Sequence, residues 1–182
     1  VLALVLVPAS PSSSSSLSLL ARRWLRRLVW LLLLSASVPG AAAASACKAS
    51  DPSLGLTMAG PNYYVGSNSV LATVCRQCQS IDYLYIFQCA DCTDETLITC
   101  STLTSITGKS SLGWSLVIYN TPLITSLVGL RHLSGSLPGG LQVYNMDKLV
   151  SLDGLEKVTS LGGDIGGTYS ISLYNNPVLV SA

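Results

Sequence analysis

Apolar and polar residues alternate in three short segments of the second half of the chain. Each segment reads apolar, any residue, apolar, Tyr, Asn, which is the period-two pattern of a β-strand with one buried face. The segments are residues 116–120, 141–145 and 171–175. After the first two, apolar residues and a glycine return at identical offsets, with Ile124, Leu127, Gly129 and Leu130 matching Leu149, Leu152, Gly154 and Leu155. The segments start 25 and 30 residues apart, so the pattern predicts repeats that bury their apolar faces by stacking on one another.

The predicted fold class is β, a parallel single-stranded β-helix or solenoid of the leucine-rich-repeat-like kind over residues 95–182. Stacked strands would line up three asparagines as a structural ladder at the inward corner, bonded to backbone groups of the turn. These are Asn120, Asn145 and Asn175. A degenerate earlier repeat is expected around Leu97 and Thr99, with Ile98 facing outward.

The last repeat carries the most specific pattern, Ile171-Ser-Leu-Tyr-Asn-Asn-Pro-Val-Leu179. It resembles a repeat of the receptor L-domain, the β-solenoid module of insulin- and EGF-receptor ectodomains and of fungal and protist surface proteins. One residue separates the second apolar strand residue from Asn, whereas a leucine-rich repeat has two. The resemblance covers residues 97–182 and implies an extracellular scaffold that binds a ligand. The kinase and membrane-spanning parts of such receptors have no counterpart here.

The first 46 residues are predicted to lie outside the folded part. Residues 1–21 contain a serine run and are expected to be unstructured, and residues 22–46 resemble a secretory signal peptide. The latter has a basic start at Arg22, Arg23, Arg26 and Arg27, an apolar run over 28–34, and small residues that allow cleavage after Ala44 or Ala46. A retained membrane anchor over 28–46 and a lipid-modified Cys47 are the alternatives.

All six cysteines fall in a Cys-rich segment, residues 47–94, or just after it. They are Cys47, Cys75, Cys78, Cys89, Cys92 and Cys100. Behind a signal peptide an even count predicts disulfides, although two Cys-x-x-Cys pairs also fit a zinc site in a cytosolic chain. Fifteen pairings are possible. We expect Cys75 and Cys78 to bond to Cys89 and Cys92, Cys47 to bond to Cys100, and no metal to be bound.

Aromatic residues mark the predicted binding surface. Tyr119, Tyr144 and Tyr174 would form an outward column and are the candidate ligand-binding residues, since tyrosine combines contact area with a hydroxyl. The alternative is that these rings only stabilise the sheet across strands. The expected partner is an extracellular protein or a glycan.

Charge and motifs exclude several functions. Without the leader the chain has six basic and nine acidic residues, a net charge of −3, which gives no case for nucleic acid or an anionic membrane. No nucleophile, phosphate-binding or metalloprotease motif is present, and the lone His132 has no partner by motif. We therefore predict a secreted or cell-surface, non-catalytic adhesion or binding module without a cofactor. The alternatives are a structural wall or coat protein and, less favoured, a polysaccharide-acting enzyme.

The last predicted repeat breaks off after Leu179. Nothing after its strand would cover Ile171, Leu173 and Leu179, and terminal repeats need a cap. The sequence therefore predicts a fragment, with a further repeat, a cap or an anchor following in the natural protein.

Overall fold

The computed structural model describes residues 44–163, 166 and 169–180. The chain divides into two compact units, Val1–Ala41 and Ala42–Ala182. The first unit lies outside the described residues, and with it the segment predicted to be unstructured and most of the predicted signal peptide. In the part that is described, no helix has the length and apolarity needed to cross a membrane.

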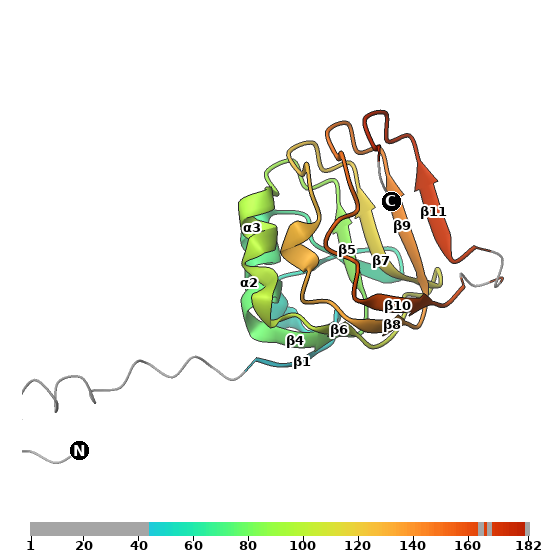
Figure 1. Ribbon diagram of the computed structural model, residues 1–182. Helices are drawn as coiled ribbons and strands as arrows, with labels where there is room; N and C mark the ends of the chain where they lie inside the picture. The colour runs from blue at the N-terminus through green and yellow to red at the C-terminus, as the bar shows by residue number, and fades with distance from the viewer. Residues whose placement is uncertain (1–43, 164–165, 167–168, 181–182) are drawn as a thin grey trace, which may run out of the picture. The chain divides into compact units, whose positions relative to one another are not determined.

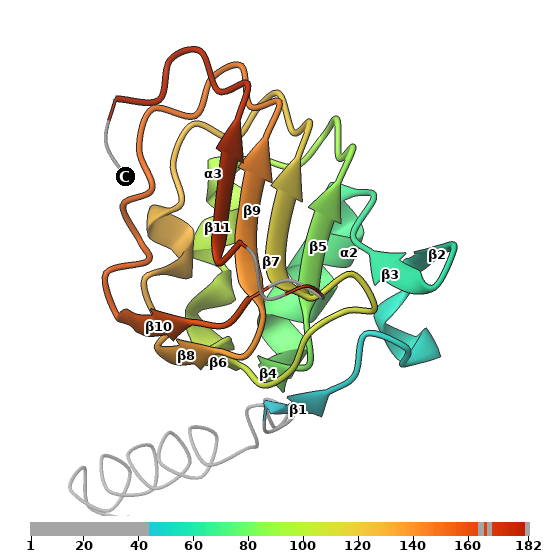
Figure 2. The same ribbon diagram turned by 90° about the vertical axis from the view of Figure 1, so that its right-hand side faces the viewer.

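The largest sheet has four parallel strands in the order β11-β9-β7-β5, seen face-on in Figure 2. They are β5 (Leu84–Phe87), β7 (Trp114–Tyr119), β9 (Gly140–Tyr144) and β11 (Ile171–Tyr174). The strands predicted from the three repeats are confirmed. They pair without offset at their tyrosines, because alternate apolar residues such as Leu116, Ile118 and Val143 are buried on one face.

Shorter parallel strands run along the lower edge of the unit (Figures 1 and 2). They are β1 (Ser45–Cys47), β4 (Cys78–Ile81), β6 (Ser105–Ile106), β8 (Gly135–Leu137) and β10 (Val158–Leu161). β1, β4 and β6 form one sheet, and β8 and β10 form another. Two residues of the predicted leader, Ser45 and Ala46, thus lie in a strand.

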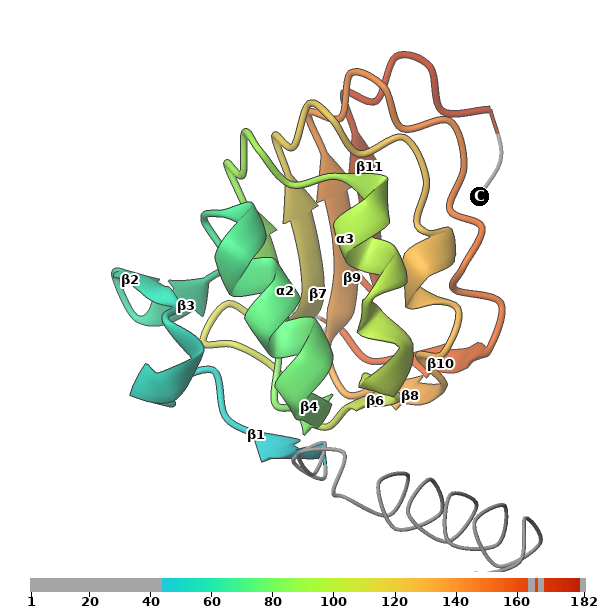
Figure 3. The same cartoon turned by 90° about the vertical axis from the view of Figure 1, so that its left-hand side faces the viewer.

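Two helices cover the inner face of the large sheet (Figure 3). They are α2 (Asn68–Gln77) and α3 (Asp94–Ile98). Residues 70–74 are Val-Leu-Ala-Thr-Val, a composition that locally favours a strand, but they belong to α2. The Ser67 side chain accepts a hydrogen bond from the Val70 N–H as an N-cap, and Leu71, Val74 and Cys75 bury one helical face. Burial at helical spacing here overrides the local preference for a strand.

Short 3-10 turns complete the layer beside the helices: η1 (Pro52–Leu54), η2 (Cys100–Thr102) and η3 (Val128–Leu130). One apolar cluster extends through the unit, from Cys47 to Leu149. The core therefore crosses the boundary expected near residue 95.

A hairpin stands beside β5 at the side away from β11 (Figure 2). Its antiparallel strands are β2 (Thr57–Ala59) and β3 (Asn62–Tyr64). The residue that follows, Val65, fixes it to β5. The Val65 N–H donates to the Tyr85 carbonyl at 2.7 Å, and the Phe87 N–H donates to the Val65 carbonyl at 3.0 Å. Nothing in the predicted pattern indicated this hairpin.

The predicted fold class is wrong. The described residues form four separate sheets of two to four strands, one of them antiparallel, together with α2 and α3. They form no solenoid and no closed sheet. The repeat pattern governed only the large sheet, because a period-two pattern specifies strands and their faces but not the segments between them.

Candidate functional site

Equivalent residues of the four strands stand in rows across the outer face of the large sheet. One row is Tyr85, Val117, Gln142 and Ser172, and the next is Phe87, Tyr119, Tyr144 and Tyr174. The strands pair in register, so each row brings side chains from segments far apart in sequence to neighbouring positions about 4.8 Å apart. The three predicted tyrosines therefore lie together.

The second row is a continuous aromatic column. Ring centroids lie 4.6 Å apart between Phe87 and Tyr119, 4.2 Å between Tyr119 and Tyr144, and 6.0 Å between Tyr144 and Tyr174. Tyr64 of the hairpin extends the column, with its ring edge-on to Phe87 at 5.4 Å. The rings thus contact one another across strands, as a role in stabilising the sheet requires. Their part in binding a ligand stays a prediction.

Exposure differs along the column. Tyr174 is 62% exposed, whereas Tyr119 and Tyr144 are half-buried. Burial raises the pKa of Tyr144 above its ordinary value, so its hydroxyl stays protonated at neutral pH. The stacked faces of Tyr119 and Tyr144 are occupied by each other, which leaves their edges and hydroxyls for a ligand.

Two members of the column were missed from the sequence. Phe87, and not Ile98, occupies the position that precedes Tyr119, because the first strand of the sheet is β5 and residue 98 ends α3. The signal was present in Tyr85-Ile86-Phe87-Gln88, which matches Val117-Ile118-Tyr119-Asn120. Tyr64 had no such signal, since its segment does not belong to a repeat.

A second aromatic group is buried beside the column, under the N-terminal segment. It comprises Ala49, Tyr83, Tyr85, Trp114 and Val117. The hydroxyl groups of Tyr85 and Ser110 are hydrogen-bonded to each other, and burial raises the Tyr85 pKa to about 12. Trp114 lies over Gly140, where a Cβ atom would come within 2.5 Å of the indole ring. This group therefore packs on residues of β5 and β7 and reaches β9 at Gly140.

A cavity of about 210 Å³ lies between the hairpin and the sheet. Nine residues line it: Ala59, Asn62, Tyr64, Tyr85, Phe87, Leu112, Val117, Gln142 and Tyr144. Four are aromatic, and among the described residues none that lines the cavity carries a charge. We call this space the hairpin cavity.

Two carboxamides give the hairpin cavity its polar groups. Asn62 is 7% exposed, and its Oδ1 accepts hydrogen bonds from the Ser111 N–H at 3.2 Å and the Ser111 hydroxyl at 2.9 Å. Within the described residues its Nδ2 donates no hydrogen bond, and the half-buried Gln142 amide makes none. Donor and acceptor atoms are therefore available in a space whose other lining residues are aromatic or aliphatic.

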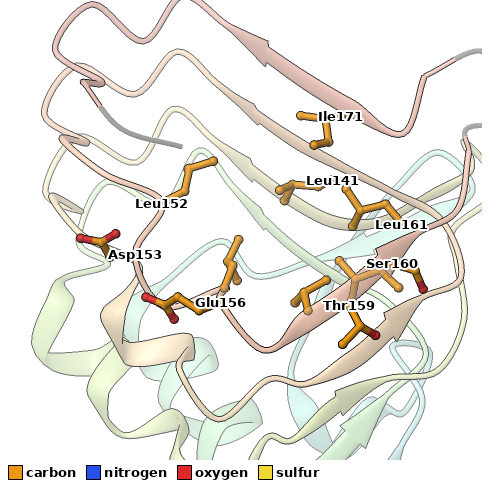
Figure 4. Close-up of a pocket in the computed structure, with 11 residues that line it drawn as sticks. Leu141, Leu152, Asp153, Glu156, Thr159, Ser160, Leu161 and Ile171 are labelled. Carbon is orange, nitrogen blue, oxygen red and sulfur yellow. The ribbon is translucent and has the colours of Figure 1, made fainter.

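A larger cavity of about 430 Å³ opens at the β10 and β11 end of the core (Figure 4). Most of its lining is apolar, including Leu141, Leu152, Leu161 and Ile171. The Glu156 carboxylate at its rim accepts a hydrogen bond from the Gly154 N–H at 2.8 Å, which lowers the pKa of that carboxyl. Among the described residues this end of the apolar core is open, and Leu152, Leu155 and Leu161 pack against the core there.

The predicted asparagine ladder forms only in part. The side chains of Asn145 and Asn175 are hydrogen-bonded, but Asn120 and Asn175 are exposed rather than inward. The backbone contacts expected of the ladder belong instead to Asn176, whose Nδ2 donates to the Val143 carbonyl at 2.9 Å. What the three ladder residues share is a left-handed backbone, with φ of 48°, 55° and 53°.

All six cysteines are in disulfides, which confirms the prediction and calls for an oxidising environment. The expected pairing is wrong. The pairs are Cys47 with Cys78, Cys75 with Cys100, and Cys89 with Cys92.

Tertiary contacts explain these pairs. Strand β1 lies beside β4, which brings Cys47 to Cys78. The buried face of α2 packs near η2, which brings Cys75 to Cys100. Asp91 lies close enough to Cys89 and Cys92 for the three to hold a metal ion, but sulfurs joined in a disulfide offer no thiolate ligand.

The chain was compared with known proteins by family, by sequence and by structure. No family model, no curated protein and no solved structure matches it.

Proposed function

We propose that this chain is a non-catalytic, secreted or cell-surface binding module whose ligand contacts the aromatic column of the large sheet. Its contact residues are Tyr119, Tyr144 and Tyr174, extended by Phe87 and Tyr64. The observation that carries the proposal is the continuity of this column across four strands, ending in a ring that is 62% exposed at the β11 edge. Exposed aromatic residues clustered on a rigid element are typical of binding surfaces.

The chemistry of the face also favours binding over catalysis. The outward residues of the strands are aromatic, aliphatic, amide or hydroxyl side chains, with no acid or histidine among the four in-register strands. The disulfides support an extracellular setting. Kinship with the receptor L-domain remains a proposal, supported by the repeat at residues 171–179 alone.

The test is a binding screen of the purified chain against arrayed glycans and a displayed peptide library. Tyr174→Ala and Tyr144→Ala are compared with Ile98→Ala, which removes a large apolar side chain that is 55% exposed on α3. We expect the two tyrosine variants to lose about tenfold in affinity or more for the ligand found, and the control to bind normally. Binding that both tyrosine variants retain would contradict the proposal.

A structural wall or coat protein is the second candidate, favoured by the apolar end at β10 and β11, which is open in the part of the chain that the structure describes. There Ile171 is 51% exposed and Leu173 is 37% exposed. Analytical sedimentation of the purified chain tests this second candidate. End-to-end assembly would give polymers, and Leu173→Gln would prevent them. A chain that stays monomeric at high concentration would contradict the structural role.

A further inference from the structure

We infer that the hairpin cavity is a subsite for one neutral pyranose ring of a glycan. The inference rests on the proposed function and names the ligand class at the inner end of the same surface.

The size of the hairpin cavity sets the first limit on the ligand that it can hold. Its volume is about 210 Å³, below the roughly 300 to 1,000 Å³ typical of sites for drug-sized molecules. A single six-membered ring fits a space of this size, and a larger ligand must extend outside it. The aromatic column offers that extension, because Tyr144 both lines the hairpin cavity and stacks with Tyr119 and Tyr174.

Charge sets the second limit. None of the described residues that line the hairpin cavity is an acid, a base or a histidine. Burial raises the pKa of both Tyr85 and Tyr144, so neither hydroxyl brings a negative charge to the hairpin cavity at physiological pH. A uronate, a sulfated sugar or a phosphorylated ligand would enter without a counter-charge and lose its hydration. The occupant is therefore uncharged.

The amide groups set the third limit. Asn62 is more than nine-tenths buried, yet its Nδ2 has no hydrogen-bond partner among the described residues. The Gln142 amide, also within the lining, offers a donor and an acceptor. A purely aliphatic occupant would shut these atoms away from water at a cost of about 1 to 3 kcal/mol for each unsatisfied group. The occupant must therefore bring hydroxyl or amide groups of its own.

A pyranose meets all three limits. Its C–H face is apolar and packs against aromatic rings, while its edge presents hydroxyls that both donate and accept. Tyr64, Tyr85 and Phe87 supply the rings, Tyr144 contributes its edge and hydroxyl, and Asn62 with Gln142 supplies the amides. The hairpin is what creates this site, because Asn62 and Tyr64 lie on β3 while the remaining rings lie on β5 and β9.

The experiment is an NMR titration of the purified, ¹⁵N-labelled chain with four neutral tetrasaccharides, those of glucose, mannose, galactose and N-acetylglucosamine. The tetrasaccharide of galacturonic acid serves as the charged counterpart of the galactose probe. At least one neutral probe is expected to shift the Gln142 and Asn62 side-chain amide signals, and the uronate is expected to leave them unchanged.

Two variants test the site. Gln142→Leu removes the amide and Ala59→Trp fills the hairpin cavity from an exposed position of β2, and each is expected to weaken binding by about tenfold or more. The matched control is Gln79→Leu, which removes a glutamine that is exposed on β4 of the lower sheet. Near-ultraviolet circular dichroism checks that every variant is folded.

The outcomes separate the two proposals. Failure of all four neutral probes, equal binding of the uronate, or unchanged affinity in both Gln142→Leu and Ala59→Trp would overturn the pyranose subsite. If Tyr174→Ala nevertheless weakens binding of a peptide or another ligand, the proposed binding function stands without it. If no column variant weakens any binding, both proposals fail.

Discussion

Asn175 donates a hydrogen bond from its side-chain Nδ2 to Oδ1 of Asn145 at a distance of 2.8 Å. The two asparagines end neighbouring strands, and both have a left-handed backbone. Gln88 has the same conformation after β5, and Asn120 after β7. The backbone N–H groups of Gln88, Asn120 and Asn145 each donate a hydrogen bond to the tyrosine carbonyl of the next strand. The distances are 2.9 Å, 3.3 Å and 3.2 Å, respectively. The repeated Tyr-Asn pair thus couples the end of each strand to its neighbour.

The first prediction concerns this left-handed position. Asn120 is the clean test, because its side chain makes no hydrogen bond to any described residue. Asn120→Ala is expected to lower the free energy of unfolding by about 1 kcal/mol, since a Cβ without a polar side chain disfavours this conformation. Asn120→Gly is expected to lose less stability, because glycine adopts the left-handed conformation freely. Urea denaturation measures both, and an alanine variant as stable as the glycine variant would contradict the explanation.

A second prediction concerns a close approach between η3 and α3. A Cβ atom at Gly129 would lie 2.3 Å from the carbonyl carbon of Leu97, so the backbone of one element must move. Gly129→Ala is expected to cost about 2 to 3 kcal/mol of stability. Gly60→Ala is the control, since nothing lies within 4 Å of its Cβ and only its φ of +59° opposes the change; it should cost about 1 kcal/mol. Equal thermal shifts for the two variants would refute the packing argument.

The third prediction concerns the disulfides. Non-reducing peptide mapping should recover Cys47 with Cys78, Cys75 with Cys100, and Cys89 with Cys92. Cys47 and Cys78 are 31 residues apart, and Cys89 and Cys92 are 3 apart. Loop-closure entropy then predicts a loss in the free energy of unfolding of roughly 3 to 4 kcal/mol for the double variant Cys47→Ser/Cys78→Ser. The corresponding loss for Cys89→Ser/Cys92→Ser is about 2 kcal/mol. Recovery of any peptide that joins Cys89 to Cys75 or Cys78 would restore the pairing expected from sequence.

A fourth prediction follows from the buried Tyr85. Burial raises its pKa from 10.0 to about 12 in the folded protein. The unfolded chain therefore loses this proton first, so the contribution of Tyr85 is fully present below pH 10 and is lost as the pH rises towards about 12. Chemical denaturation at pH 9 and at pH 11 measures the fall in the free energy of unfolding. Tyr85→Phe should be less stable than the natural chain at pH 9, because it lacks the hydrogen bond to Ser110. Its free energy of unfolding should fall by less between pH 9 and pH 11. A fall of the same size in both proteins would exclude Tyr85 as its source.

The proposed binding surface was predictable where the sequence repeats itself. Alternation around Leu116 and Ile118 defined which face of each strand is buried, and the recurring Tyr-Asn pair placed Tyr119, Tyr144 and Tyr174 in one outward row. Both are local properties, since successive side chains of a strand point to opposite faces whatever the strand packs against. Even the missed Phe87 obeys the same pattern.

Other features depended on contacts between segments that no local pattern connects. Residues 70–74 have a composition that favours a strand but belong to α2, because their apolar residues at helical spacing bury against the core. Cysteine pairing followed from which segments lie side by side, and six cysteines alone leave every pairing open. The hairpin cavity exists only because β3 reaches β5 through Val65, which brings Asn62 and Tyr64 beside Gln142 and Tyr144. The sequence by itself thus determined the strands, their faces and the row of tyrosines, whereas the helices, the pairing of the cysteines and the hairpin cavity were decided by long-range packing.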